Sequence, residues 1–151
     1  MKKLILSLIA VTCFAFVGIA QDEGEIKFGA GLNTFDAFEA FGIQGKAIYG
    51  LNETLDLSGA FTFWLEDGLD WQIDANVQYK GLNVSESFKL QPLAGLSMTR
   101  FGFAGFSTTN TALHIGGSFR FVLESGMTVY AEPIIVIDDG SGLNIAGGIL
   151  F

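Results

Sequence analysis

Residues 71–80, WQIDANVQYK, alternate strictly between apolar and polar side chains. Because successive side chains of a β-strand point to opposite faces, this segment predicts a strand with one apolar face and one polar face. A water-soluble sheet protein buries the apolar face, whereas a membrane-spanning barrel turns it toward lipid. The direction of this pattern therefore decides what kind of protein the chain can form.

The same alternation recurs along the chain, with turn residues between the segments and no helical period. We expect eight strands, near residues 25–33, 41–50, 54–64, 71–80, 88–99, 112–122, 127–137 and 143–151. Each is about the 9–11 residues that a tilted strand needs to cross a bilayer. An even number of strands returns the chain to the side on which it started. The two prolines in these segments, Pro92 and Pro133, are expected to mark bulges or bends.

Within each segment, large apolar side chains occupy every second position, and small or polar side chains occupy the positions between them. Only 16% of the residues are charged and 50% are hydrophobic, which is unsuitable for a water-exposed barrel surface. We therefore expect the large side chains to face lipid and the polar side chains to fill the interior. The aromatic residues near strand ends are expected in interfacial girdles: Tyr49, Trp64, Trp71, Tyr79 and Phe151.

The first 20 residues have the layout of a secretory signal peptide. Lys2 and Lys3 precede an uncharged apolar run that ends in small residues before Gln21. We expect cleavage after Ala20, which leaves a barrel domain over residues 21–151. The alternative is an anchor that stays in place, because the run is close to the lower length of a spanning helix.

Cleavage changes the charge and the cysteine content of the chain. Six basic residues would remain against 16 acidic ones, a net charge of −10, and the only cysteine, Cys13, would leave with the signal. An acidic chain argues against a nucleic-acid partner, since nucleic acid requires a basic surface. Without cysteine, no disulfide framework holds the exported protein.

The chain ends in LNIAGGILF, where Ile145, Gly147, Ile149 and Phe151 share one parity. Together with the signal peptide, the eight alternating segments and glycine-rich stretches such as LHIGGSFRF, this end resembles the small eight-stranded outer-membrane barrels, the OmpX-like proteins and the OmpA transmembrane domain. The resemblance implies an all-β, antiparallel, up-and-down transmembrane barrel in the bacterial outer membrane, with a polar filled interior. It also implies that these four residues form the signal read by the barrel-insertion machinery, with periplasmic chaperones assisting during biogenesis.

Candidate chemistry in the interior is limited. Arg120 and Glu132 lie on adjoining predicted strands and are the best candidates for an interior ion pair, because an unpaired buried charge is costly. His114 points inward near Ser118, and no acid is spaced to orient it, so we expect no catalytic activity. We also expect no cofactor and no metal site, because one histidine and scattered carboxylates do not form a ligand set.

The expected outer loops are short and mostly acidic. They carry Asp36, Glu39, Glu66, Asp67, Asp70, Asp138 and Asp139 against one base, Arg100. These carboxylates either share the divalent cations of the lipopolysaccharide surface or simply keep the loops soluble. Residues 100–111 are expected as a short loop whose Phe101, Phe103 and Phe106 extend the lipid-facing band or form a patch for a partner.

The sequence therefore predicts a monomeric outer-membrane barrel in contact with lipid and lipopolysaccharide, with a structural or surface-interaction role. One alternative is a small or gated channel. A second is a soluble exported carrier of lipocalin type, which would hold an apolar ligand in its lumen. The short outer loops argue against an adhesin with a protruding sheet.

Overall fold

The computed structural model describes residues 24–103, 105–138 and 142–151. The expected signal peptide and its cleavage site lie outside these residues, as does Asp139. The described strands are β1 (Ile26–Phe35), β2 (Ala40–Gly50), β3 (Leu55–Trp64), β4 (Leu69–Tyr79), β5 (Leu82–Asn83), β6 (Phe88–Phe103), β7 (Phe106–Val122), β8 (Thr128–Ile137) and β9 (Gly142–Leu150). A 3₁₀ turn, η1 (Asp36–Phe38), joins β1 to β2. No helix in the described part of the chain is long and apolar enough to cross a membrane.

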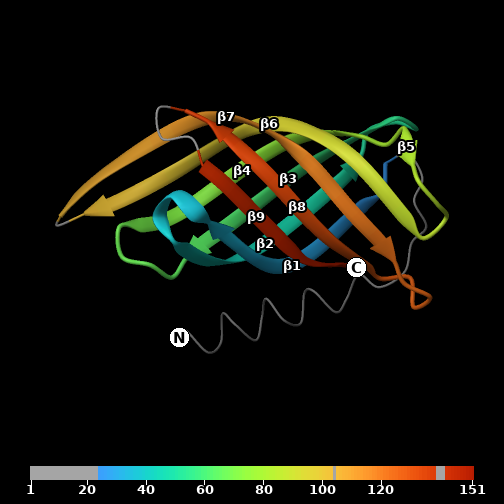
Figure 1. The fold of residues 1–151 in the computed structure, drawn as a ribbon, viewed down its shortest axis with the longest axis horizontal. Helices are drawn as coiled ribbons and strands as arrows, with labels where there is room; N and C mark the ends of the chain where they lie inside the picture. Colours follow the sequence, from blue (N-terminus) through green and yellow to red (C-terminus); the bar gives the residue numbers. More distant parts are fainter. Residues whose placement is uncertain (1–23, 104, 139–141) are drawn as a thin grey trace.

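The strands form one antiparallel sheet that closes into a barrel. Each long strand pairs with the long strand before it and the one after it in the chain (Figure 1). Among the described strands, the two-residue β5 pairs only with β6, so β4 and β6 pair directly with each other. Pairing of β1 with β9 closes the barrel. Eight long strands therefore make the wall. The predicted eight-stranded, antiparallel, up-and-down barrel is confirmed.

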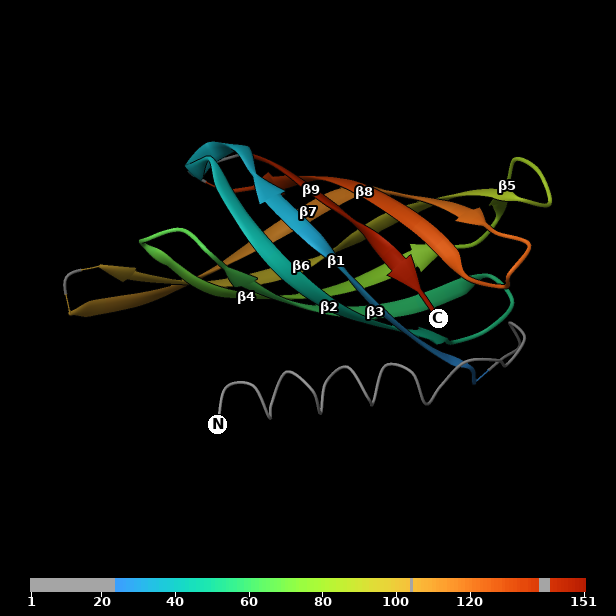
Figure 2. The same ribbon diagram turned by 90° about the horizontal axis from the view of Figure 1, so that it is seen from below.

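Burial alternates along the strands of the barrel wall in the direction that the sequence predicted, and among the described strand residues only the hairpin part of β7, residues 106–111, is exposed on both faces. On β4, Ile73 and Val77 are 41% and 46% exposed, whereas Asp74 and Asn76 are 4% and 5% exposed. Figure 2 shows the same wall from below, with the strands strongly tilted around the lumen. The large apolar side chains face outward and the polar side chains are enclosed, as in a barrel surrounded by lipid.

The β6–β7 hairpin contradicts the expectation of a short loop over residues 100–111. Both strands continue without a register shift to Phe103↔Phe106, and the hairpin extends well beyond the other strand connections (Figure 1). Gly105, with φ of 87°, supplies the left-handed conformation of its tight turn. Residues 100–103 and 106–111 are therefore strand and not loop.

Trp64 contradicts the expected girdle, whereas both prolines lie where strand pairing is irregular. Trp64 is 2% exposed and lies inside the lumen, because it shares the parity of the buried Thr62 and not that of the outward Phe63. The β6–β7 register runs unbroken through Pro92, but on the other side of β6 the pairing changes at this proline from Leu82↔Leu90 with β5 to Gln78↔Leu93 with β4, a shift of one residue. The β7–β8 register is the same on both sides of Pro133, but neither Pro133 nor Glu132 pairs with β7, so the ladder is interrupted there without a bulge. A further register shift, which the sequence did not predict, occurs between Leu69 and Trp71.

Candidate functional site in the barrel lumen

Charged side chains from β2, β3, β7 and β8, and from Lys80 directly after β4, meet in the half of the lumen near the C-terminal residue Phe151. Arg120 Nη1 donates to Asp56 Oδ2 at 3.2 Å, and Lys80 Nζ lies 3.0 Å from Asp56 Oδ1. Lys46 forms an ion pair with Glu132, and both side chains are almost fully buried. We call these five residues the charge network.

Gln78 joins the two halves of the charge network. Its amide oxygen accepts a hydrogen bond from Arg120 Nη2, and its Nε2 donates to Glu132 Oε1 at 3.4 Å and to Ser58 Oγ at 2.9 Å. Arg120 and Glu132 therefore belong to one network, but each forms its ion pair with another residue. The direct pair expected from the sequence is replaced by Arg120–Asp56 and Lys46–Glu132.

Tyr130 packs beside the charge network. Its hydroxyl donates to Gln44 Oε1 at 3.0 Å, and Lys46 Nζ lies 4.9 Å from the centre of its ring. Tyr130 also belongs to an apolar cluster with Ile48, Ala146 and Leu150. Side chains therefore fill this half of the lumen, as the small diameter of an eight-stranded barrel requires.

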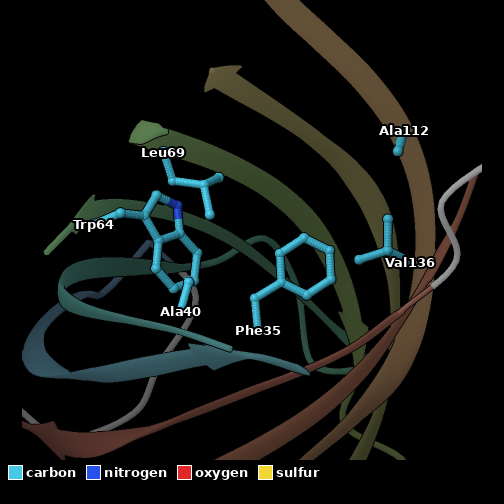
Figure 3. Packing of buried hydrophobic residues seen from close by; sticks show 6 residues of the cluster. All are labelled: Phe35, Ala40, Trp64, Leu69, Ala112 and Val136. Carbon is cyan, nitrogen blue, oxygen red and sulfur yellow. The ribbon is translucent and has the colours of Figure 1, made fainter. Parts of the chain in front are cut away.

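A second apolar cluster occupies the opposite half of the lumen. Phe35 lies between Trp64 and Val136, with its ring centre 6.4 Å from that of Trp64, and Ala40, Leu69 and Ala112 complete the cluster (Figure 3). We call it the apolar layer. It lies near the end that carries η1 and the β6–β7 hairpin, which we call the loop end.

His114 is fully enclosed in the lumen, between the apolar layer and the charge network. Its Nε2 donates to Asn76 Oδ1, and Ser118 Oγ instead accepts from Arg120 Nε at 3.3 Å. Nδ1 of His114 has no protein partner among the described residues. The histidine and serine singled out in the sequence are thus held by different partners and do not form a nucleophile–base pair.

A cavity of about 330 Å³ lies at the loop end, between β4, β6, β7, β8 and η1. Its lining includes Phe38, Gln72, Ser97, Thr99, Phe101 and Asp138, and we call it the mouth cavity. No sequence pattern pointed to it, because its residues come from distant segments that only the barrel register brings together.

The acidic residues of the loop end are dispersed. Asp70 forms an exposed ion pair with Arg100 at 3.3 Å, and Asp36 Oδ1 accepts a hydrogen bond from the backbone of Leu143. Within residues 24–103, 105–138 and 142–151, no group of three or more His, Cys, Asp or Glu side chains could hold a metal ion.

The phenylalanines of the β6–β7 hairpin also separate. Phe101 turns inward, with its ring centre 5.4 Å from that of Phe38, whereas Phe106 at the tip is 84% exposed. Phe101 and Phe106 therefore do not form one patch.

Comparison with known proteins gives a structural match without a sequence match. No family model and no curated protein sequence match the chain. The N-terminal β-barrel domain of Pseudomonas aeruginosa OprF superposes with a TM-score of 0.66 at 14% identity, covering 87% of this chain and 100% of that one. A de novo designed transmembrane β-barrel gives a TM-score of 0.63 at 16% identity, covering 88% of this chain and 98% of the design.

The chain has the fold of the small outer-membrane β-barrels. The Yersinia pestis outer-membrane protein Ail, solved in a phospholipid nanodisc, matches with a TM-score of 0.52 at 17% identity, covering 85% of this chain and 100% of Ail. Ail in complex with the heparin analogue sucrose octasulfate gives a TM-score of 0.52 at 18% identity, covering 85% and 99%. The resemblance to OmpX-like barrels predicted from the sequence is thus confirmed at the level of the fold.

Proposed function

We propose that the protein is an integral outer-membrane barrel whose role is surface contact, made by the protruding β6–β7 hairpin. The observation that carries the membrane assignment is the reversed burial on each strand, as between Ile73 and Asp74. A soluble carrier of lipocalin type would enclose its apolar face, so this reversal argues against that alternative.

The β6–β7 hairpin supports the contact role because one of its edges is available. β7 pairs with β8 from Leu113 onward, so residues 106–112 pair only with β6 among the described strands. An unpaired strand edge recruits an extended segment of another protein through backbone hydrogen bonds. The exposed Phe106 at the tip adds an apolar contact next to this edge.

The charge of the loop end favours a protein partner over a polyanion. Asp36, Glu39, Glu66 and Asp67 lie in its connections, and its base Arg100 is paired with Asp70. Ail was solved with a heparin analogue. A sulfated ligand of that kind would be repelled here, so we do not extend that binding to this chain.

The membrane assignment is tested by fractionation and gel mobility. The folded barrel should be recovered from outer membranes only with detergent and should change its mobility in SDS only after boiling. Folded monomer released from the periplasm without detergent would support the soluble carrier instead.

The contact role is tested by shortening the β6–β7 hairpin. Phe101 and Thr108 form a register pair, so replacing residues 102–107 with Asn-Gly should close a two-residue turn without disturbing the barrel. Cells expressing this variant should lose adhesion to a panel of immobilised extracellular proteins that the unaltered protein supports. A Phe106→Ser control distinguishes the contribution of the tip side chain to adhesion from that of the strand edge. Unchanged adhesion by the shortened variant would contradict the proposal.

The predicted insertion signal remains part of this proposal. Ile145 and Ile149 are exposed on the outer face of β9, the strand that closes the barrel against β1. This is the face that an insertion machinery would contact before closure. Replacing Phe151 with Ser should lower the amount of folded barrel in the outer membrane without changing synthesis.

A further inference from the structure

Hydroxyl groups without partners line the bottom of the mouth cavity. Ser97 and Thr99 are 3% and 7% exposed, and neither side chain makes a hydrogen bond with a described residue. Both face the cavity from β6, and Gln72 faces it from the adjoining β4, opposite Thr99 in the register. These hydroxyls therefore have hydrogen-bonding capacity that they can offer to a polar occupant of the cavity.

The amide groups of the mouth cavity present acceptors to such an occupant. Gln72 Nε2 donates to Asp74 Oδ1 at 2.7 Å, which leaves Gln72 Oε1 for a ligand. Nδ2 of Asn110 is likewise engaged by Asp138, which leaves the amide oxygen of Asn110. None of the described residues that line the cavity is Lys, Arg or His. The surroundings therefore favour a ligand that donates hydrogen bonds.

Aromatic rings and negative charge point to a cation. The ring centres of Phe35 and Phe38 are 5.1 Å apart, those of Phe38 and Phe101 are 5.4 Å apart, and all three residues line the cavity. Aromatic faces attract organic ammonium groups, and a carboxylate such as that of Asp138 at the rim adds to this attraction. The acidic loop end raises the local concentration of cations.

We propose that the mouth cavity binds a small organic ammonium ion about the size of one six-membered ring. Its ammonium group donates to Ser97, Thr99 and Gln72 and lies beside the phenylalanine rings, and its carbon skeleton fills the rest of the cavity. A volume of about 330 Å³ is near the lower end for ligand pockets, which are roughly 300–1,000 Å³. This site is independent of the β6–β7 edge and goes beyond the proposed contact role.

The test compares two water-soluble ligands that differ in one group, D-glucosamine in its protonated form and D-glucose. The protein is refolded in detergent with Trp71→Phe, which leaves Trp64, packed against Phe35, as the only tryptophan. Glucosamine should change the Trp64 fluorescence in a saturable way, and glucose should bind at least about tenfold more weakly because it lacks the charge. Equal binding of glucose, or no saturable response to glucosamine, would overturn the proposal.

Matched variants locate the site. Ala112 lines the cavity, so Ala112→Leu should fill it and abolish glucosamine binding, whereas Ala94→Leu on the outward face of β6 should leave binding unchanged. The heat-dependent gel shift reports whether both variants fold. The double variant Ser97→Ala, Thr99→Val removes the two hydroxyls without adding volume and should weaken binding about fivefold to tenfold. Unchanged affinity in this variant and in Ala112→Leu would place the ligand elsewhere and refute the site.

Discussion

Arg120 on β7 forms a 3.2 Å ion pair with Asp56 on β3, although β4 and β6 lie between these strands in the barrel wall. The contact therefore crosses the lumen. Asp56 also forms an ion pair with Lys80, the residue directly after β4, so one carboxylate links β3 to β7 and to the end of β4 through the interior.

Asp56→Asn should lower the free energy of unfolding by about 3–5 kcal/mol, the usual cost of leaving a buried charge without its partner. The reason is that Arg120, 2% exposed, would keep only neutral partners in Gln78 and Ser118. Urea titration of the protein in lipid vesicles measures the change. Asp70→Asn is the matched control, because its pair with Arg100 is largely exposed and should contribute at most about 1 kcal/mol. Equal losses in both variants would show that burial does not strengthen the lumen pair.

The lumen should not conduct ions at the level of a porin. Two barriers lie in series, the apolar layer around Phe35 and Trp64 and the charge network around Arg120 and Glu132. Purified protein in planar bilayers should give no steady open level of porin size, with a general porin as the positive control. Long-lived open steps would favour the channel alternative.

The barrel wall leaves no space for a side chain at Gly95 but leaves space for one at Gly45. A Cβ on Gly95 would lie 2.1 Å from the carbonyl oxygen of Ala75 and 2.9 Å from His114 Nε2, whereas a Cβ on Gly45 would meet no atom within 4 Å. Gly95→Ala should destabilise the barrel by roughly 1–3 kcal/mol through overpacking. Gly45→Ala should be neutral or slightly stabilising, because alanine loses less backbone entropy on folding. Unfolding in urea distinguishes them, and similar stabilities of the two variants would contradict this packing.

Strand positions were predictable because the alternation is local. Residues 71–80 show it without interruption, and the structure places β4 at Leu69–Tyr79. Two errors at strand ends have physical causes. Trp64 was expected in a girdle because it is an aromatic residue near a strand end, but its position in the alternation of β3 places it inside. Residues 100–111 were expected as a loop, but β6 and β7 continue through them to the pair Phe103↔Phe106.

Ion pairs in the lumen were not predictable from adjacency along the chain. Arg120 lies opposite Tyr130 in the β7–β8 register, and its partner Asp56 comes from a strand that is not its neighbour. Such pairings depend on how the strands are staggered around the barrel, which no single segment encodes. The mouth cavity could not be predicted from the sequence for the same reason, because only the β4–β6 register brings Gln72 next to Thr99.

The last prediction concerns the outward face of β4. Ala75 is exposed there, near the middle of the strand and opposite Gly59, so Ala75→Lys would put a cation against the hydrocarbon of the bilayer. We expect a loss of about 2–4 kcal/mol, the midplane cost of a lipid-facing lysine. Thr111→Lys is the control, because Thr111 also faces outward but lies toward the loop end, where a lysine reaches the interface and should cost at most about 1 kcal/mol. Urea titration of the two variants in lipid vesicles measures both losses in the free energy of unfolding. If Ala75→Lys were as stable as Thr111→Lys, the outward face of β4 would be in water and the membrane assignment would fail.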